Sequence, residues 1–382
     1  MVKEKSKIIL NYYITFILIL ASGTIYASYV FYKEFVFFLL INGILLNRLK
    51  PIKLEKLLIF IAICVMVLLN FYTYQQNVDG YIALVIKMLA VLLICNAIDI
   101  RYLYKSYVNI IFIISIVSLF CYFTWIMKPD WVMSNIPVTE VWGSAIRATP
   151  FYTFPYMGID RNFGPFKEAG MYQIFLNIGL FLVLKYDVKY KKLKSLIFLI
   201  TIITTFSTAG LITTFILIGY FLIQGKNFMK NKSLIILTLL FFMIGLWAEN
   251  EYGIISDKMN SENASYTARS SEFEITARVL ANHPLVGVGY QNNYYNLAYG
   301  FIESGTNGVL ALYQQFGVFF ASIMLLFYFK GIRSLSNSFL ELSVLFFMIF
   351  ISFSTEPTMF QPLFLIILFH KIKVFKKEEK VA

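Results

Sequence analysis

Residues 107–127 read YVNIIFIISIVSLFCYFTWIM and contain no charged side chain. As an α-helix, a stretch of this length covers about 30 Å, which is the thickness of the hydrocarbon layer of a membrane. Comparable apolar stretches recur along the chain, at about residues 8–23, 26–46, 57–74, 81–98, 169–185, 195–207, 209–224, 234–248, 307–329, 336–354 and 358–370. The sequence therefore predicts an all-α, polytopic membrane protein with about twelve transmembrane helices.

The composition agrees with this class. Of the 382 residues, 59% are hydrophobic and only 14% are charged, whereas soluble proteins are about 25% charged. A net charge of +12 could indicate a nucleic-acid-binding protein. However, 24 of the 33 Lys and Arg residues lie in seven clusters beside the apolar stretches. These clusters lie at residues 3–7, 48–56, 101–105, 185–194, 226–232, 330–333 and 371–380. With twelve spans, all seven clusters and both termini fall on the cytoplasmic side, so we expect no nucleic-acid partner.

The same topology places two long loops on the extracytoplasmic side, at residues 128–168 and 249–306. No internal repeat or low-complexity linker is visible, so we expect a single membrane domain over residues 1–382. The first loop is rich in Pro, Trp and Tyr, and this aromatic content argues against disorder. Tyr and Trp also suit the headgroup layer of a membrane, which accounts equally for their presence.

The second loop is expected to contain an amphipathic helix over about residues 271–282. Ser271, followed three residues later by Glu274, fits a capping box at its start. Apolar side chains then recur at helical spacing on one face: Phe273, Ala277 and Leu280. His283-Pro284 is expected to end the helix. Such a helix would lie on the membrane surface, near the phosphates of the lipid headgroups.

Four of the seven cationic residues in the two loops are arginines: Arg147, Arg161, Arg269 and Arg278. Arginine binds phosphate through two parallel hydrogen bonds and stays charged at every physiological pH. Arginines on the outer side also run against the positive-inside bias, so their presence needs a reason. A phosphate-bearing ligand is one reason. Salt bridges to the external acids, or contacts with lipid phosphates, are the alternatives.

Two further side chains are candidates for a general base. Glu168 begins the apolar stretch KEAGMYQIF, where its carboxylate could orient an arginine or deprotonate a sugar hydroxyl. A helix N-terminal acid favoured by the helix dipole is its commoner role. His283 stands at the predicted helix end, where packing or capping is the commoner role. Tyr290 could stack on a sugar or anchor the chain at the membrane interface.

Several enzyme classes lack their motifs in this chain. There is no Walker A, GxGxxG, HExxH or GxSxG pattern, and neither loop contains a DxD pattern. An ATPase, a nucleotide-sugar transferase and a metalloprotease are therefore disfavoured, and we expect no cofactor and no metal. The three cysteines lie in apolar stretches without metal-ligand spacing: Cys64, Cys95 and Cys121.

Three patterns in and beside the loops have a distinctive spacing. Arg269 is followed by Phe273 and then by residues 283–289, which read HPLVGVG. Upstream stands an Arg-x-x-Gly-x-Phe-x-Glu pattern, formed by Arg161, Gly164, Phe166 and Glu168. Asn307 opens an apolar stretch and is followed ten residues later by Gly317. In this order, the patterns resemble those of the O-antigen polymerase/O-antigen ligase superfamily, which assembles bacterial envelope glycans.

The resemblance implies a GT-C-like glycosyltransferase in the bacterial cytoplasmic (inner) membrane, with its active site on the outer face. Its donor would be a glycan on undecaprenyl pyrophosphate, and it would use neither metal nor nucleotide sugar. Where the superfamily has a His-Asn pair, this chain has Thr306-Asn307. Because the ligase branch is thought to use that His, its absence favours the polymerase branch (Wzy-type), which makes O-antigen or capsule. An O-antigen ligase and a lipid-linked oligosaccharide transporter or flippase are the alternatives.

The resemblance also assigns roles to the candidate residues. Arg161 and Arg269 would clamp the pyrophosphate, with Glu168 and His283 as further catalytic candidates. The candidate substrate-binding residues are Arg278, Arg147, Asn307 and Tyr290. The implied partners are undecaprenyl-pyrophosphate-linked glycans and membrane lipid, with a chain-length regulator and a flippase as further candidates.

Overall fold

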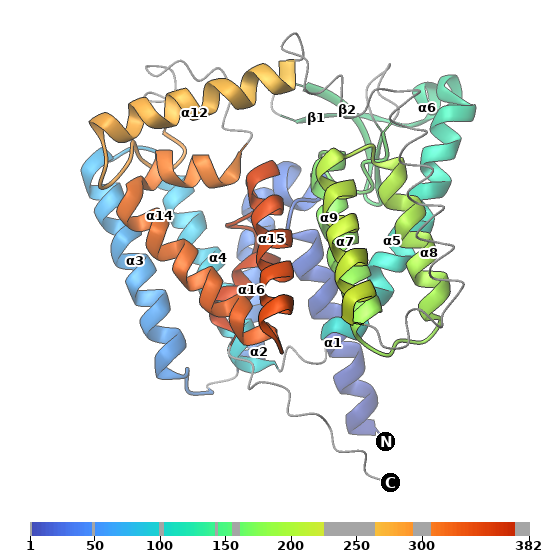
Figure 1. Ribbon diagram of the computed structural model, residues 1–382, viewed down its shortest axis with the longest axis horizontal. Coiled ribbons are helices and arrows are strands. Elements are labelled where there is room, and N and C mark those ends of the chain that lie inside the picture. Colours follow the sequence, from blue (N-terminus) through green and yellow to red (C-terminus); the bar gives the residue numbers. More distant parts are fainter. Residues whose placement is uncertain are drawn as a thin grey trace. The chain divides into compact units, whose positions relative to one another are not determined.

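The computed structural model describes residues 2–47, 50–98, 103–141, 144–154, 161–224, 264–292 and 307–370, which are mostly helical (Figure 1). Within these residues, four helices are long and apolar enough to cross a membrane: α3 (Leu54–Tyr74), α4 (Val78–Ala97), α5 (Leu103–Met127) and α14 (Gly308–Leu335). Shorter apolar helices are α7 (Ala169–Lys185), α9 (Thr208–Gln224), α15 (Phe339–Thr355) and the Ser6–Leu20 part of α1 (Val2–Leu20). A largely helical protein with several helices long and apolar enough to span a membrane is confirmed, and the number of twelve spans stays a prediction.

Further helices among the described residues include α2 (Tyr32–Asn47), α8 (Lys191–Thr204), α16 (Pro362–Phe369) and a short π-helix, η1 (Tyr26–Val30). The apolar stretch expected to form a helix over 26–46 is thus divided into η1 and α2. The span expected at 234–248 lies outside the described residues.

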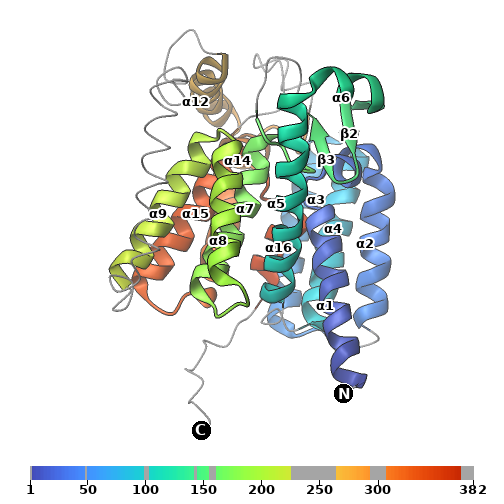
Figure 2. The ribbon, with the colours of Figure 1, turned by 90° about the vertical axis from the view of Figure 1, so that its right-hand side faces the viewer.

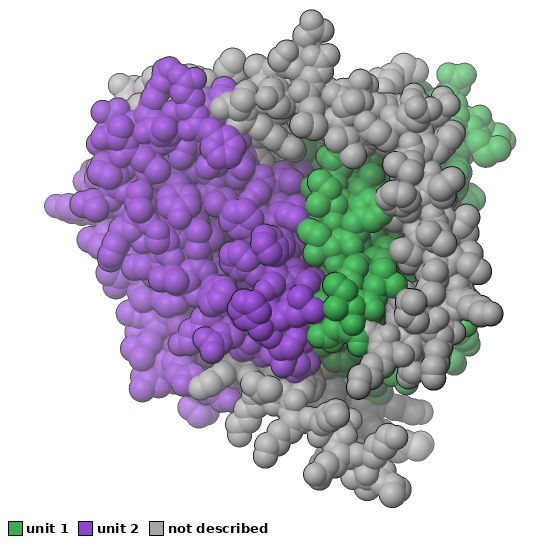
Figure 3. Space-filling view, in the orientation of Figure 1, with its two compact units in different colours: residues 1–32, 102–263 green, residues 33–101, 264–382 purple. Residues whose placement is uncertain are grey.

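The chain divides into two compact units, each built from two separate stretches of sequence. Unit 1 comprises Met1–Tyr32 and Tyr102–Asn263, and unit 2 comprises Lys33–Arg101 and Ala264–Ala382 (Figure 3). The expectation of a single membrane domain over residues 1–382 stays a prediction.

In unit 1, α5 packs against α1, α7 and α8, and α7 also packs against α8 and α9. Polar side chains join these helices inside the apolar bundle. The hydroxyl groups of Thr15 and Ser106 lie 2.7 Å apart, and the Tyr107 hydroxyl donates to the carbonyl of Phe175 at 2.9 Å. Such bonds stabilise the bundle because lipid offers buried polar groups no other partner.

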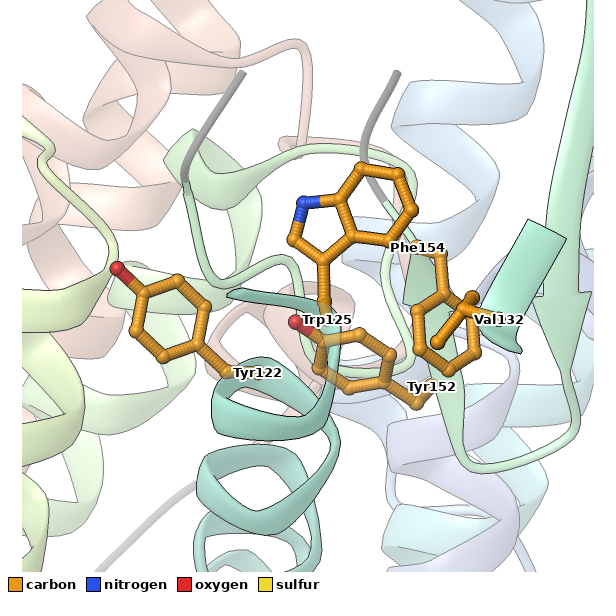
Figure 4. Packing of buried hydrophobic residues seen from close by; sticks show 5 residues of the cluster. All are labelled: Tyr122, Trp125, Val132, Tyr152 and Phe154. Atoms are coloured by element: carbon orange, nitrogen blue, oxygen red, sulfur yellow. The ribbon is translucent and has the colours of Figure 1, made fainter. Parts of the chain in front are cut away.

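The first loop of unit 1 is folded. It contains α6 (Pro129–Asn135) and an antiparallel sheet in the order β1 (Val138–Val141), β2 (Ser144–Thr149) and β3 (Tyr152–Phe154). An apolar cluster joins the sheet to α5 and α6 (Figure 4): Tyr122, Trp125, Val132, Tyr152 and Phe154. The prediction of an all-α fold misses this sheet. Its strands are too short to show an alternating pattern, and they form where their aromatic side chains pack against the end of α5.

In unit 2, α4 packs against α3 and α16, and α14 packs against α15 and α16. A further helix of unit 2, α12 (Ala264–Asn282), lies across the end of α14 (Figures 1 and 2). Glycines permit close helix contacts here. A Cβ on Gly331 of α14 would lie 2.7 Å from the Ile367 side chain of α16.

The helix expected over 271–282 begins seven residues earlier, at Ala264, so Ser271 lies inside α12 and the predicted capping box is wrong. The predicted apolar side chains lie on the outside of the protein, where Phe273 is 63% exposed and Ala277 is exposed. Among residues 271–282 of α12, the buried side chains are those of Glu272, Thr276 and Val279. Glu272 and Thr276 face α14, where they accept hydrogen bonds from Asn307 and Gln314. Docking on the membrane surface through the exposed face stays a prediction.

Candidate functional site

The Arg161 segment, residues 161–168, leads into α7 and is held by the buried side chain of Asn162. The Asn162 amide donates to Thr204 Oγ1 at 3.0 Å and to Ser118 Oγ at 3.3 Å. Its Oδ1 accepts the backbone N–H of Gly164 at 3.1 Å. The backbone N–H of Asn162 also donates to the Thr204 carbonyl at 2.8 Å. The residue after Arg161 is therefore fixed to the interior of α5, to the C-terminal end of α8 and to the next turn of its own segment.

The other motif residues of this segment are structural. Gly164 has a φ of +54°, and a Cβ there would lie 2.8 Å from the ring of Tyr172, so only glycine fits without strain. Phe166 is fully buried, with its ring centroid 4.4 Å from that of Phe175 and 5.5 Å from that of Tyr172. The Pro165 carbonyl accepts the backbone N–H of Ile25 at 3.0 Å. The spacing of glycine and phenylalanine after Arg161 thus builds a rigid support for the arginine.

Arg161 itself is half-buried at the beginning of this segment. Burial lowers the pKa of its guanidinium, because desolvation disfavours the charged form. Within the described part of the chain, the guanidinium makes no hydrogen bond and no ion pair. A partly desolvated charge without a counter-ion is unfavourable. An anionic ligand would relieve this cost, so Arg161 has the properties expected of an anion-binding residue.

The other unit 1 candidates are less suited to bind a ligand. Glu168 precedes α7 as expected, but its carboxylate is about half exposed and lies 3.4 Å from the ammonium of Lys167. Arg147 lies in β2, where its guanidinium donates to the carbonyl of Ile136 and to the sulfur of Met133. Arg147 therefore ties the sheet to the end of α6, which is a structural role.

In unit 2, α12 ends at Asn282, before His283-Pro284 as predicted, and the 283–290 turn follows. This turn binds the backbone of α14 through three hydrogen bonds. Val288 N–H donates to the Gln314 carbonyl at 2.8 Å, and Gly289 N–H donates to the Gln315 carbonyl at 3.0 Å. In return, Val318 N–H donates to the Pro284 carbonyl at 2.7 Å. The turn thus pairs with α14 where the helix is interrupted.

The interruption of α14 lies at Gly317, whose φ of 72° and ψ of 178° are not helical. A Cβ on Gly317 would lie 2.6 Å from the backbone nitrogen of Val286. Conversely, Gly287 has a φ of +65°, and its Cβ would lie 2.6 Å from the backbone nitrogen of Gly317. The two glycines are needed because two backbones meet here without space for side chains. Irregular backbone at membrane depth is tolerated when protein groups satisfy it in this way.

Asn70 of α3 is 2% exposed and binds both partners of this pairing. Its amide nitrogen donates to the Val286 carbonyl at 2.6 Å and to the Gln315 carbonyl at 3.0 Å. Its Oδ1 accepts the backbone N–H of Tyr290 at 3.2 Å and the hydroxyl of Tyr81. Asn70 is not among the residues predicted from the sequence. Its signal was a lone amide in an apolar helix, a position at which polar side chains usually contact a neighbouring helix.

Tyr290 is 6% exposed and belongs to the core of unit 2. Its ring stacks on Phe316 with centroids 5.6 Å apart, and it meets Tyr81 and Phe360 at 5.6 and 5.9 Å. Packing in the core of unit 2 therefore accounts for the aromatic ring at position 290 without a sugar ligand. His283 is partly exposed and meets the ring of Tyr74 edge-on, with centroids 6.4 Å apart.

Asn307 caps α14, because its Oδ1 accepts the N–H groups of Val309 and Leu310 at 3.0 and 3.1 Å. The buried carboxylate of Glu272 accepts the N–H of Asn307 itself at 3.1 Å. One turn along α12, the Thr276 hydroxyl accepts from the Gln314 amide at 2.7 Å. Glu272 belongs to the second loop, whose acids were possible salt-bridge partners for the arginines. In the structure it stabilises the first turn of α14, where the helix dipole favours a negative charge.

Of the two arginines in α12, Arg278 is exposed and pairs with Glu274 one turn before it. An exposed pair of this kind contributes little stability. It is the salt bridge to an external acid that was the alternative to phosphate binding for these arginines. Arg269 lies in the first half of α12, and its side chain is outside the described part of the structure.

The candidates thus divide between the two units. Arg161, Glu168 and Arg147 belong to unit 1, whereas the candidates from Arg269 to Asn307 belong to unit 2. A joint site made by Arg161 and Arg269 stays a prediction. Within the described ranges, no group of three or more His, Cys, Asp or Glu side chains is placed to hold a metal ion. A comparison of the sequence with known protein families finds no match, and a comparison with curated proteins finds none either.

Proposed function

We propose that this protein is a polysaccharide polymerase of the bacterial cytoplasmic membrane, making O-antigen or capsule. It transfers a growing glycan from undecaprenyl pyrophosphate to the non-reducing end of a repeat unit carried by a second such lipid. Both loops lie on the outer side of the membrane in this proposal. The apolar helices of the structure support a membrane setting, and the motif residues support the superfamily.

The reaction needs no redox step and no nucleotide. A hydroxyl oxygen of the acceptor sugar attacks the anomeric carbon of the donor glycan and forms the new glycosidic bond. The bond between that carbon and the pyrophosphate oxygen breaks, and the pyrophosphate takes the electron pair. The hydroxyl proton passes to a base or to water. Negative charge therefore develops on the pyrophosphate, and fixed cations beside it lower the barrier.

Arg161 carries this proposal, because its half-buried guanidinium has no hydrogen bond or ion pair within the described residues. Its support is rigid, since the neighbouring Asn162 is bound to Ser118 and Thr204. A donor held in place before the ligand arrives loses little freedom on binding, which favours charge stabilisation in the transition state. A planar guanidinium can also hold two phosphate oxygens at once. Arg269 is the second cation of the proposed clamp.

The experiment is a reconstitution of the purified protein in liposomes with an authentic undecaprenyl-pyrophosphate-linked repeat unit as sole substrate. We expect a ladder of longer lipid-linked chains. Arg161→Ala should lower the rate by about 10²–10³-fold, the usual effect of removing one electrostatic donor. Lys128→Ala, which removes an exposed cation from the same loop, should retain the ladder. A correctly folded wild-type protein that extends none of several authentic units would refute the proposal.

A further inference from the structure

We propose that Asn70 and Tyr74 of α3 form a latch that keeps the 283–290 turn seated in the interruption of α14. In this role they are positioning residues for the C-terminal end of α12 and the N-terminal half of α14. The importance of this position for catalysis rests on the proposed function. The latch itself is a claim about structure, and it can be tested without any activity.

Asn70 uses its full hydrogen-bonding capacity at this place. An asparagine side chain has two N–H donors and one oxygen with two lone pairs. The two donors meet carbonyls from different segments, Val286 of the turn and Gln315 of α14. The oxygen accepts the N–H of Tyr290, which ends the turn, and the hydroxyl of Tyr81 in α4. A single buried side chain therefore joins three helices and the turn.

Tyr74 adds a second connection one helical turn further along α3. Its hydroxyl donates to the carbonyl of Gly287, the glycine that meets the backbone of Gly317. α3 therefore binds the turn at Val286 and Gly287, and the bonds to Gln314 and Gln315 hold it from α14. Removing the α3 side chains would leave several backbone groups without partners in an apolar surrounding, which favours an opened turn.

The position of α12 depends on the seating of this turn. Near its middle, α12 is fixed to α14 by the Glu272–Asn307 and Thr276–Gln314 bonds. At its C-terminal end it passes directly into the 283–290 turn, and Val279 packs against the fully buried Val288. An opened turn would leave α12 attached at one region only. The helix that carries Arg269 would then no longer be held in one orientation.

The test measures whether the turn opens when the latch is removed. Val288→Cys is placed in a background in which Cys64, Cys95 and Cys121 are alanine, and its labelling by a membrane-impermeant maleimide is timed. Because Val288 is 0% exposed, labelling should be slow. Adding Asn70→Leu should accelerate it by about 10–100-fold, as expected when buried polar groups lose their partners. Adding Tyr74→Phe, which removes one hydroxyl and keeps the ring, should accelerate it by about 3–10-fold.

Thr73→Val is the matched control. Thr73 lies on the same helix, is exposed, and its hydroxyl bonds only to the Leu69 carbonyl of its own helix within the described structure. Labelling of Val288→Cys should be unchanged by Thr73→Val. If Asn70→Leu does not yield a monodisperse protein, Tyr74→Phe decides the question. Labelling at the wild-type rate in a folded latch variant would overturn the proposal.

The polymerisation assay separates the latch from the proposed function. Asn70→Leu should lower the rate of chain extension at least about tenfold, while its binding of undecaprenyl pyrophosphate through Arg161 in unit 1 persists. Fast labelling with an unaltered ladder would contradict the positioning role of the latch. A wild-type protein that makes no ladder would contradict the proposed function and leave the labelling result valid.

Discussion

Gly287→Ala tests the pairing of the 283–290 turn with α14. The new methyl group would meet only backbone atoms: the Gln314 carbonyl oxygen, and the Gln315 carbonyl carbon and Gly317 nitrogen at 2.6 Å each. Backbone atoms cannot relieve the clash by changing rotamer, as a flexible side chain can. The residue also has a φ of +65°, which alanine adopts at a cost. The substitution should therefore displace the turn rather than be absorbed locally.

The expected destabilisation combines two terms. The left-handed conformation costs alanine about 1–2 kcal/mol, and forced overpacking costs about 1–3 kcal/mol more. Together they give about 2–5 kcal/mol, which corresponds to a fall in Tm of roughly 5–15 °C for a unit of this size. The Val288→Cys labelling rate should rise in the same variant, because the displaced turn exposes its buried face.

The assay is thermal unfolding of the purified protein in detergent, with Gly219→Ala as control. Gly219 lies inside α9, and a Cβ there would meet nothing within 4 Å. Alanine should stabilise that helix by about 0.5–1 kcal/mol. Gly317→Ala should lower the Tm as Gly287→Ala does. The double variant should be destabilised by less than the sum of the two single variants, because both displace the same turn. A Gly287→Ala protein with the wild-type Tm would refute the pairing of turn and helix.

Two further predictions concern the cap of α14 and the absence of a metal. Glu272→Gln keeps an oxygen for the Asn307 N–H, so it should cost only the charge–dipole part, about 0.3–1 kcal/mol. Glu272→Leu leaves that N–H unpaired and should cost about 1–3 kcal/mol; equal Tm values for the two variants would contradict the cap. Polymerisation should continue in excess EDTA, and a ladder that is lost with EDTA and restored by a divalent cation would contradict the metal-independent reaction.

The sequence predicted the helices well because lipid imposes a strict requirement. The expected span 169–185 coincides with α7, and the span expected at 57–74 lies within α3. In hydrocarbon, every backbone polar group must be bonded within the segment, so long apolar stretches have few alternatives to helix. The small sheet over residues 138–154 escaped prediction because its short strands depend on packing against α5.

The spacing of the motifs was visible in the sequence, but their physical roles were not. Gly164, Gly287 and Gly317 could be recognised as motif positions, yet only the structure shows which ring or backbone approaches each of them. Asn70 could not be linked to the turn, because its contacts are more than two hundred residues away in sequence. In α12, the local Ser271-Glu274 signal gave the wrong start, since the helix begins seven residues earlier, at Ala264.

The most direct test of the central claim is the binding of undecaprenyl pyrophosphate to the purified protein, compared among wild type, Arg161→Ala, Arg161→Lys and Lys128→Ala. If the guanidinium of Arg161, which has no partner among the described residues, holds the pyrophosphate, Arg161→Ala should raise Kd by about 10–100-fold, the equivalent of one charge-assisted hydrogen-bonded contact. Arg161→Lys should recover only part of the affinity, because an ammonium cannot hold two oxygens in one plane. Lys128→Ala should bind as wild type does. Equal Kd values for wild type and Arg161→Ala would contradict the account.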